Sequence, residues 1–334
     1  MVQSDKPVLV TGASGFVGAA VVRALLAAGR KVRALLRPAS DRRNVEGLTV
    51  DLRLGSLTEP RTLAAALEGC GVLYHVAADY RLWVRDPATM YAINVDGTRS
   101  LMEAALAAGV GRIVYTSSVA TLGWRSDGIA ADETTPSDLA DMVGHYKRSK
   151  FLAEAAVRDL VQTRKLPAVI VNPSTPVGPR DVKPTPTGRI IIEAAAGRMP
   201  AYVDTGLNVV HVDDVARGHL LAEDKGRVGE RYILGGENLT LGDILRLVAG
   251  VVGRTPPKIQ VPAALVWPVA VVEEALGWLI GREPFATREG LRMARHKMFF
   301  SSAKAERELD YRARPARDGL ADAIAWFRQA GMVR

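Results

Sequence analysis

The chain has 334 residues, of which 48% are hydrophobic and 24% are charged, a composition that excludes an intrinsically disordered chain. The formal net charge of +8 comes from lysines and arginines scattered among acidic residues, and this pattern argues against a nucleic-acid-binding protein. The single cysteine, Cys70, excludes an intrachain disulfide and fits a reducing compartment. Because it comes just before an apolar run, we expect it to be buried.

The N-terminal residues lead at once into an apolar run that starts at Pro7, which leaves no room for a secretory signal peptide. We therefore expect a cytoplasmic protein. Short β-branched runs then alternate with longer runs rich in alanine and leucine. The predicted strands are residues 7–12, 31–37, 48–55, 71–78, 112–118 and 168–173, and the predicted helices are 16–29, 60–69, 91–110 and 145–164. This alternation predicts an α/β fold, a doubly wound parallel sheet with helices on both faces.

The regular alternation ends in a loop rich in proline and glycine at 172–189. A strand and a helix at 206–222 follow, and we expect both to return to the main sheet. The later elements are predicted as a strand at 230–236, a helix at 239–253 that is capped near Thr240, and a terminal helix at 318–331. The chain therefore divides into a first domain, residues 1–173 with a return near 207–222, and a smaller interleaved region, residues 174–334.

Three glycines follow the first predicted strand and open the first predicted helix. In such a strand–turn–helix unit, one glycine allows the tight turn, one lets the backbone approach a pyrophosphate, and one allows close helix–strand packing. The N-terminus of the helix then faces the anion. The predicted cofactor loop comprises Gly12, Ser14, Gly15, Phe16, Val17 and Gly18. This order predicts a Rossmann-type dinucleotide-binding domain, which leaves the smaller C-terminal region for binding the substrate.

The second predicted strand lacks the acidic residue that usually binds the adenosine ribose of NAD. Arg37 stands in its place, with two more arginines at 42–43. A guanidinium can bind a 2′-phosphate through paired charge-assisted hydrogen bonds, so we expect NADP, with NAD as the alternative if Arg37 only faces solvent. Ser56 and Leu57, after the third predicted strand, are expected to contact the adenine.

Ser118, Tyr146 and Lys150 carry the predicted chemistry. Ser118 ends the fifth predicted strand, at the edge of an open α/β sheet where ligands bind. Hydride transfer to a carbonyl needs an acid that protonates the developing alkoxide, and a tyrosine can serve if a nearby cation lowers its pKa. Lys150 lies one turn after Tyr146 on the same helical face, and Ser118 would donate a hydrogen bond to the reacting oxygen. The alternative is a surface pair without a catalytic role.

Seven short motifs occur along the chain. They are TGASGFVG at 11–18, HVAA at 75–78, NVDGT at 94–98, TSSVATLG at 116–123, YKRSK at 146–150, NPSTPVGP at 172–179 and HVDDVA at 211–216. With them, the chain resembles the extended short-chain dehydrogenase/reductases over essentially its whole length. The resemblance implies that Tyr146 is the acid/base, that Lys150 binds the ribose and lowers the pKa of Tyr146, and that Ser118 is a second donor. It also implies that Ala77 contacts the cofactor and that Pro173 neighbours the nicotinamide.

Within that group, segments 75–87, 115–123 and 298–311 are most similar to the hopanoid-associated sugar epimerase branch, whose functionally described relatives are the dihydroflavonol 4-reductases. The resemblance implies a bacterial protein that acts on a sugar-like or lipid-linked substrate in hopanoid side-chain metabolism. Relatives usually carry an aspartate where this chain has Ser56, so the adenine contact departs from the family's pattern.

The reaction has two alternatives. A net reductase draws on the NADP pool, whereas a sugar epimerase regenerates its NAD within each turnover. Arg37 favours the reductase. A third alternative, of a different class, is a non-catalytic dinucleotide-sensing protein, against which the presence of Tyr146 and Lys150 argues.

The substrate is expected between the nicotinamide and the smaller region. The predicted contacts are Tyr80, Trp83, Thr175, Pro176 and Arg180. Alternatively, the aromatic side chains at 80 and 83 form a flap that packs on the core. We predict no metal site, because His145 and His211 have no partner at metal-ligand spacing and are interpreted as structural. Asp213 and Asp214 are interpreted as helix-start residues rather than catalytic carboxylates.

The apolar stretch at 259–281 has the length of a membrane span, but Glu273 and Glu274 would be costly inside a bilayer. We interpret it as a buried helix of the smaller region. The alternatives are a helix that lies on the inner membrane, with basic residues at 292–297 attracting anionic head groups, or the lining of an apolar tunnel.

The predicted helices at 93–109 and 146–162 have alanine-rich faces, and they resemble the pair through which relatives form a four-helix interface. We therefore also expect a homodimer.

Overall fold

The computed structural model describes residues 6–81, 83–84, 86–125, 127–281, 284–285 and 287–333. Its largest element is a seven-stranded sheet in the order β10-β6-β5-β4-β1-β2-β3, with every neighbouring pair parallel. The strands are β1 Val8–Thr11, β2 Val32–Leu36, β3 Asp51–Leu54, β4 Val72–His75, β5 Arg112–Thr116, β6 Ala168–Pro173 and β10 Arg231–Leu234. The predicted doubly wound parallel sheet is therefore confirmed. Its strand order reverses between β1 and β4, and ligands of such sheets bind at the carboxyl ends of the strands beside that point.

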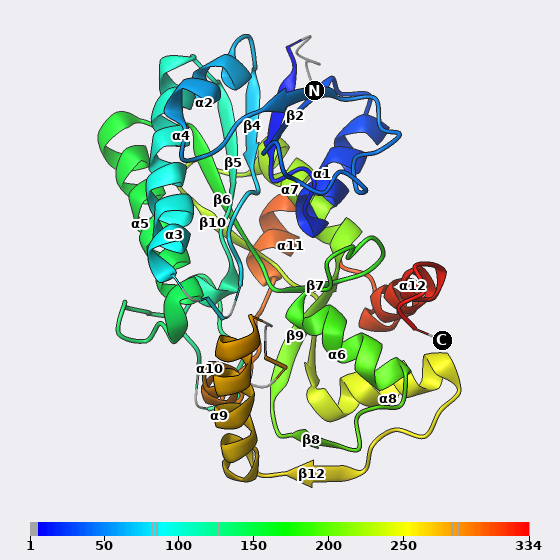
Figure 1. Cartoon of the computed structure of the whole chain (residues 1–334). Coiled ribbons are helices and arrows are strands. Elements are labelled where there is room, and N and C mark those ends of the chain that lie inside the picture. The colour runs from blue at the N-terminus through cyan, green and yellow to red at the C-terminus, as the bar shows by residue number, and fades with distance from the viewer. Residues whose placement is uncertain are drawn as a thin grey trace.

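Helices cover both faces of this sheet (Figure 1). The helices on one face are α1 Phe16–Ala27, α7 Val212–Lys225 and α11 Ala303–Leu309, and those on the other are α2 Pro60–Leu67, α4 Gly97–Ala107 and α5 Gly144–Arg164. Alternate residues of one strand serve the two layers: Val8 and Val10 pack under α1, while Leu9 packs under the opposite helices. Cys70 is buried in the second layer, as predicted.

The predicted helix at 91–110 is divided. It consists of α3 Pro87–Tyr91, a π-helical turn at Ala92–Asp96, and α4. Such turns are frequent at functional sites, and this one carries the buried side chain of Asn94.

The smaller region lies at the carboxyl end of the main sheet (Figure 1). Its sheet has the order β11-β9-β13, with β7 also paired to β9, and a separate pair joins β8 to β12. Its strands are β7 Thr175–Val177, β8 Ala201–Val203, β9 Gly206–His211, β11 Glu237–Thr240, β12 Ile259–Val261 and β13 Lys297–Met298. Its helices are α6 Pro186–Ala195, α8 Leu241–Val252, α9 Ala263–Ile280, α10 Arg288–Met293 and α12 Ala316–Gln329.

One expectation about this region is wrong. The strand within 206–222 does not return to the main sheet, because β9 pairs with β7, β11 and β13. Only the helix that follows it, α7, packs on the main sheet, and β10 is the later strand that joins the sheet's edge beside β6. A buried apolar strand looks the same in either sheet, so the hydrophobic pattern could not distinguish them.

The predicted helix starts are confirmed. Thr240 caps α8: its hydroxyl accepts from the Asp243 amide at 3.1 Å, and the Asp243 carboxylate accepts from the Thr240 amide at 3.1 Å. Asp213 and Asp214 occupy the first turn of α7, where carboxylates stabilise the helix dipole.

The interpretation of 259–281 as a buried helix is wrong. Within α9 only Ala270 and Gly277 are buried, and large apolar side chains such as Trp278 and Leu279 are 68% and 75% exposed. By length and composition alone α9 could cross a membrane, since its 18 residues have a mean hydropathy of 1.6. An apolar sequence predicted burial, but nothing in the sequence shows whether other elements cover it.

We predict opposite effects for alanine at two helical glycines. A Cβ at Gly18 would lie 2.1 Å from the Gly12 carbonyl oxygen, so Gly18→Ala should lower the free energy of unfolding by about 1–3 kcal/mol. Gly250 in α8 is exposed and has open space around it, so Gly250→Ala should raise it by about 0.5–1 kcal/mol. Denaturant unfolding measures both changes. Equal effects of the two substitutions would contradict the packing at Gly18.

Candidate functional site

The glycine turn brings three backbone segments together at the carboxyl end of β1. Gly12 has a φ of +70°, and a Cβ there would lie 2.7 Å from Cα and N of Ala77. The turn leads into α1, whose first turn contains no acidic residue, so its partial positive charge faces the crevice. Backbone without side chains, next to a helix N-terminus, fits the pyrophosphate of a dinucleotide.

A buried histidine supports this turn from below. His75 Nδ1 lies 2.8 Å from the Thr11 hydroxyl, and its Nε2 lies 2.9 Å from the Thr98 hydroxyl. Burial, together with the charge of Lys150, lowers the pKa of His75 to about 3. The ring is therefore neutral and joins β1, β4 and α4. The sequence motifs at 75–78 and 94–98 include His75 and Thr98, but gave no indication that the two side chains meet.

The predicted adenosine-binding residues lie at the ends of two paired strands. Leu36 of β2 pairs with Leu54 of β3, so Arg37 and the segment that begins at Gly55 leave the sheet side by side. Arg37 is exposed, while Leu57 is buried. Ser56 is half-buried and its hydroxyl lies 2.8 Å from that of Thr58.

Two neighbours of Arg37 have other roles. The guanidinium of Arg43 is paired with Asp41 at 2.5 Å, which commits it to a local contact. The buried side chain of Asn44 donates to the Ser14 carbonyl at 3.1 Å and so braces the glycine turn. No sequence signal singled out Asn44, because its partner is a backbone carbonyl 30 residues away.

Ser118, Tyr146 and Lys150 come together at the carboxyl end of β5. The Ser118 hydroxyl lies close enough to the Tyr146 phenol to lower the pKa of that group, and it accepts from the Ala120 amide at 3.1 Å. The side chain of Lys150 is buried, and its Nζ donates to the Thr116 carbonyl at 2.8 Å and to the Tyr115 hydroxyl at 3.4 Å. Burial lowers the pKa of Lys150 to about 8, against the opposing charge of Glu154. Lys150 is therefore mainly a cation at neutral pH.

The pKa of Tyr146 is raised by burial, and the nearby Ser118 hydroxyl opposes that rise. The phenol is thus protonated at neutral pH, the state required of a proton donor. The expectation that Lys150 lowers this pKa is therefore wrong, because burial is the largest influence on the phenol and raises its pKa.

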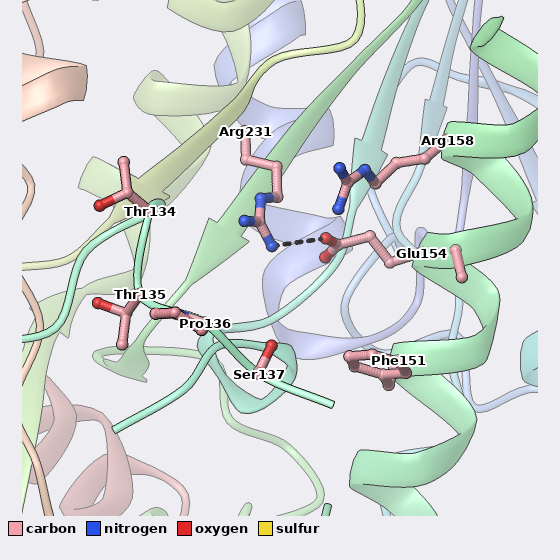
Figure 2. A pocket seen from close by; sticks show the side chains of 9 residues that line it. Thr134, Thr135, Pro136, Ser137, Phe151, Glu154, Arg158 and Arg231 are labelled. Atoms are coloured by element: carbon pink, nitrogen blue, oxygen red, sulfur yellow. Dashed lines mark hydrogen bonds and ion pairs between the residues drawn. The ribbon is translucent and has the colours of Figure 1, made fainter. Parts of the chain in front are cut away.

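Glu154, one turn beyond Lys150, anchors a buried network behind these residues. Its carboxylate accepts from Ser117 at 2.5 Å, from Thr121 at 2.9 Å and from Asn172 at 3.1 Å, and pairs with Arg231 at 3.2 Å. Figure 2 shows the ion pair from the side of a cavity of about 220 Å³. The network joins α5 to β5, β6 and β10, and so fixes the helix that carries Tyr146 and Lys150.

The network also extends to the serine itself. The Asn172 amide donates to the Ser118 carbonyl at 3.0 Å, which sets the backbone at that position. The sequence analysis missed both Glu154 and Asn172. The spacing of Glu154, four residues after Lys150, was the available signal.

Four of the five predicted substrate residues lie in two segments that follow β4 and β6. Tyr80 is 41% exposed and Trp83 is half-buried, in a segment held by Asn94, which bonds the Asp79 amide at 2.7 Å and its carbonyl at 2.8 Å. Thr175 and Pro176 are half-buried in β7. The structure thus gives the positions of these four residues, but their contact with a substrate stays a prediction.

Pro173 is buried at the end of β6, next to Ser174, whose buried hydroxyl has no hydrogen-bond partner among the described residues. An unsatisfied buried hydroxyl at this edge fits a site that a polar ligand group completes.

Arg180 follows β7 and forms an ion pair at the start of α7. Its guanidinium bonds Asp213 at 2.8 Å, and its charge helps to lower the pKa of Arg23, for which burial is the larger cause. Arg180 thus lies near α1 and the start of α7. Its predicted contact with substrate remains a prediction.

The two histidines have contacts that fit structural roles. His211 is buried, accepts from the Asp213 amide at 3.0 Å and lies 3.1 Å from Asp322. His145 lies 3.3 Å from the Tyr91 hydroxyl. In the described part of the chain, no group of three or more His, Cys, Asp or Glu side chains is arranged to hold a metal ion.

A family model agrees with this architecture. Residues 8–235 match the NAD dependent epimerase/dehydratase family. The chain belongs to this family, the extended short-chain dehydrogenase/reductases. The predicted family is therefore confirmed, and its members are NAD(P)-dependent oxidoreductases and epimerases.

Two full-length relatives are similar in sequence. A protein from Synechocystis sp., provisionally assigned as a dihydroflavonol 4-reductase, is 44% identical over 97% of this chain and 95% of its own. Sterol demethylase protein B of Methylococcus capsulatus is 38% identical over 97% of this chain and 99% of its own.

Two solved structures are similar in fold. That of gox2253 superposes with a TM-score of 0.89 at 56% identity, covering 99% of this chain and all 100% of the other. A nucleoside-diphosphate-sugar epimerase from Pseudomonas aeruginosa superposes with a TM-score of 0.81 at 28% identity, covering 99% and 100% of the two chains.

We predict that Glu154→Ala lowers the free energy of unfolding by about 2–4 kcal/mol, because it removes the carboxylate partner of the half-buried Arg231 and the acceptor of the buried Ser117 hydroxyl. Glu103 is exposed on α4, so Glu103→Ala should change it by less than about 0.5 kcal/mol. Urea unfolding of both variants measures the difference. If Glu154→Ala lowers the free energy of unfolding by less than about 1 kcal/mol, the network does not hold α5 in place.

Proposed function

We propose that the protein is an NADP-dependent oxidoreductase that transfers hydride at a secondary alcohol or ketone of a sugar-like group. The observation that carries this proposal is the convergence of Ser118, a protonated Tyr146 and a buried Lys150 beside the glycine turn. We further propose that the substrate is lipid-linked and belongs to hopanoid side-chain metabolism.

Each of these residues has a chemical role in the proposal. The nicotinamide, when bound, supplies or accepts the hydride. Tyr146 donates a proton to the oxygen that becomes an alkoxide, and Ser118 holds that oxygen by a hydrogen bond. Lys150 provides the positive charge that binds the ribose hydroxyls.

The remaining contacts fix the cofactor's orientation. The glycine turn would hold the pyrophosphate, Pro173 would lie beside the nicotinamide, and Ala77, next to Gly12, would contact the cofactor. Arg37 binds the 2′-phosphate, which its exposed position after β2 allows. Leu57 and Ser56 contact the adenine from the neighbouring strand end.

The names of several relatives support an apolar substrate. Besides sterol demethylase protein B, they include a 3-beta-hydroxysteroid dehydrogenase of Mycolicibacterium neoaurum, 30% identical over 91% of this chain, and a ketoreductase of a farnesyl-dihydroquinoline from Stigmatella aurantiaca, 31% identical over 96%. The proposed contacts of this substrate are Tyr80, Trp83, Thr175, Pro176 and Arg180.

A second candidate is a sugar epimerase that retains NAD. It is favoured by the similarity to the Pseudomonas aeruginosa epimerase and to DesIV, a dTDP-glucose 4,6-dehydratase from Streptomyces venezuelae solved with NAD at 26% identity. Arg37 favours the oxidoreductase over the epimerase. A contact with the 2′-phosphate is useful to an enzyme that takes up NADPH in each turnover, but not to one that retains NAD. The proposed homodimer, through α4 and α5, is common to both.

We predict that Arg37→Ala weakens NADPH binding by about 10-fold or more, the loss of one charge-assisted contact, and changes NADH binding by less than about 2-fold. The matched control is Arg61→Ala, which removes an exposed guanidinium from α2 and should affect neither affinity. Calorimetric titration of the wild type and both variants with NADPH and NADH gives the six dissociation constants. Equal losses for the two cofactors in Arg37→Ala would contradict NADP recognition by this residue.

We also predict a pH dependence. Because burial lowers the pKa of Lys150 to about 8, its ammonium is present below that pH and is lost above it. NADPH affinity of the wild-type protein should therefore weaken as the pH rises through about 8. In Lys150→Arg the charge persists, so this inflection should disappear. An unchanged inflection in that variant would assign the titration to another group.

Proton donation gives a separate prediction. Tyr146→Phe should lower kcat by about 10²–10⁴-fold, the range for loss of a general acid, while leaving the NADPH dissociation constant within about 2-fold. Steady-state oxidation of NADPH with a panel of ketones, combined with the binding titration, measures both. Retention of full turnover in the variant would remove Tyr146 from the chemistry.

A further inference from the structure

Helix α9 has its polar and apolar faces reversed relative to an ordinary surface helix. Its two carboxylates face the protein: Glu273 accepts from the Phe285 amide at 2.8 Å, and Glu274 accepts from Arg288 Nε at 2.6 Å and from its amide at 2.7 Å. A helix on the surface of a water-soluble protein turns its charged residues outward and its apolar residues inward. In α9, three hydrogen bonds to the carboxylates of Glu273 and Glu274 hold the charged face of the helix toward the protein.

The outer face of α9 is apolar along its whole length. A stripe of exposed side chains recurs at helical spacing: Leu265, Val269, Val272, Leu276 and Leu279. Val271, Trp278 and Ile280 are exposed on either side of it. At 3.6 residues per turn, these positions cover more than half of the helix circumference without a charged residue.

This apolar face identifies a class of partner. Exposed apolar surface of this extent marks a protein or membrane contact. One neighbouring helix would cover only a narrow stripe, whereas a fluid apolar phase covers a wide arc.

Charge around the helix favours a bilayer with anionic head groups. Arg292 and Arg295 are exposed in and just after α10, and Arg292 lies 5.8 Å from the ring of Trp267 on α9. Lys258 is exposed just before β12, the strand that leads into the start of α9. Basic residues that border an apolar helical face attract acidic lipids.

The connections of α9 argue for a helix that lies on the membrane rather than across it. Before α9, the chain is held in the fold by the pairing of β12 with β8. After α9, Phe285 and Arg288 return alongside the helix to reach Glu273 and Glu274. Both ends therefore belong to the same folded region, and Figure 1 shows α9 and α10 side by side at the edge of the molecule.

The same segment contacts the helix that carries Tyr146. The carboxyl group of Glu289 in α10 occupies the space in front of Gly144, at the start of α5, so that any Cβ there would clash with it. The ring of His296 stacks on Trp124 with centroids 3.7 Å apart. A surface bound through α9 would thus lie near the start of α5, the helix that carries Tyr146 and Lys150.

We propose that the outer face of α9, with Arg292, Arg295 and Lys258 at its border, docks on a membrane that contains anionic lipid. The docking goes beyond the proposed reaction and does not depend on it. If both hold, the protein takes its substrate from the lipid phase next to Tyr146.

The test is co-sedimentation of the full chain with phosphatidylcholine vesicles with and without phosphatidylglycerol. We expect binding that increases with phosphatidylglycerol and decreases with salt. Leu279→Glu should lower the partition coefficient by about 10-fold or more, because it removes one buried leucine side chain and adds a repelled charge. The control Val228→Glu adds the same charge at an apolar side chain that is 49% exposed between α7 and β10, and should leave partition within about 2-fold.

Two further readouts, NADPH affinity and the oligomeric state, separate the explanations. NADPH affinity should be equal in wild type and Leu279→Glu, so a failure of docking is distinguishable from a failure of the proposed function. Absence of vesicle binding by the wild-type protein, or equal partition of the two variants, would overturn the docking. A third result would also overturn the docking: the wild-type protein sediments as a dimer and does not bind vesicles, and Leu279→Glu converts the dimer to monomers. A second copy of the chain would then cover α9.

Discussion

The close approach of two backbone segments, at Gly12 and Ala77, determines where this protein can bind a ligand. A Cβ at Gly12 would lie 2.7 Å from Ala77, so the ends of β1 and β4 meet with only backbone between them. The sheet order reverses at the same place, which opens a crevice at the carboxyl ends of the strands. The neutral His75, bonded to Thr11 and Thr98, holds the floor of that crevice without adding charge. Every proposed contact with the cofactor depends on this arrangement.

The chemistry depends on a second constraint, the placement of α5. Tyr146, Lys150 and Glu154 follow one another at intervals of four residues, so they share a face of that helix. The last of them binds into β5, β6 and β10, and this buried network orients the first two toward Ser118. A protonated tyrosine beside a buried cation is then suited to deliver a proton as hydride arrives.

Local sequence patterns predicted the fold well where a feature depends only on residues that are close together in the chain. The alternation of strands and helices, the glycine turn, the Thr240 cap and the first turn of α7 all follow from short stretches of sequence. Prediction failed where the answer depends on distant partners. The apolar strand β9 suits either sheet, and the residues that join it lie far away in the chain. The network of Glu154 and the brace from Asn44 likewise depend on tertiary contacts, and the exposure of α9 depends on elements that do not cover it.

The identity and exchange of the bound nucleotide test the account most directly. The purified protein should be denatured, any released nucleotide identified, and dissociation constants measured for NADPH and NADH. The account predicts weak, exchangeable binding with a strong preference for NADPH, because Arg37 stands where NAD-binding relatives of this fold carry an acid. Tight retention of NAD with no preference for the 2′-phosphate would contradict it and would favour an epimerase that regenerates its own cofactor.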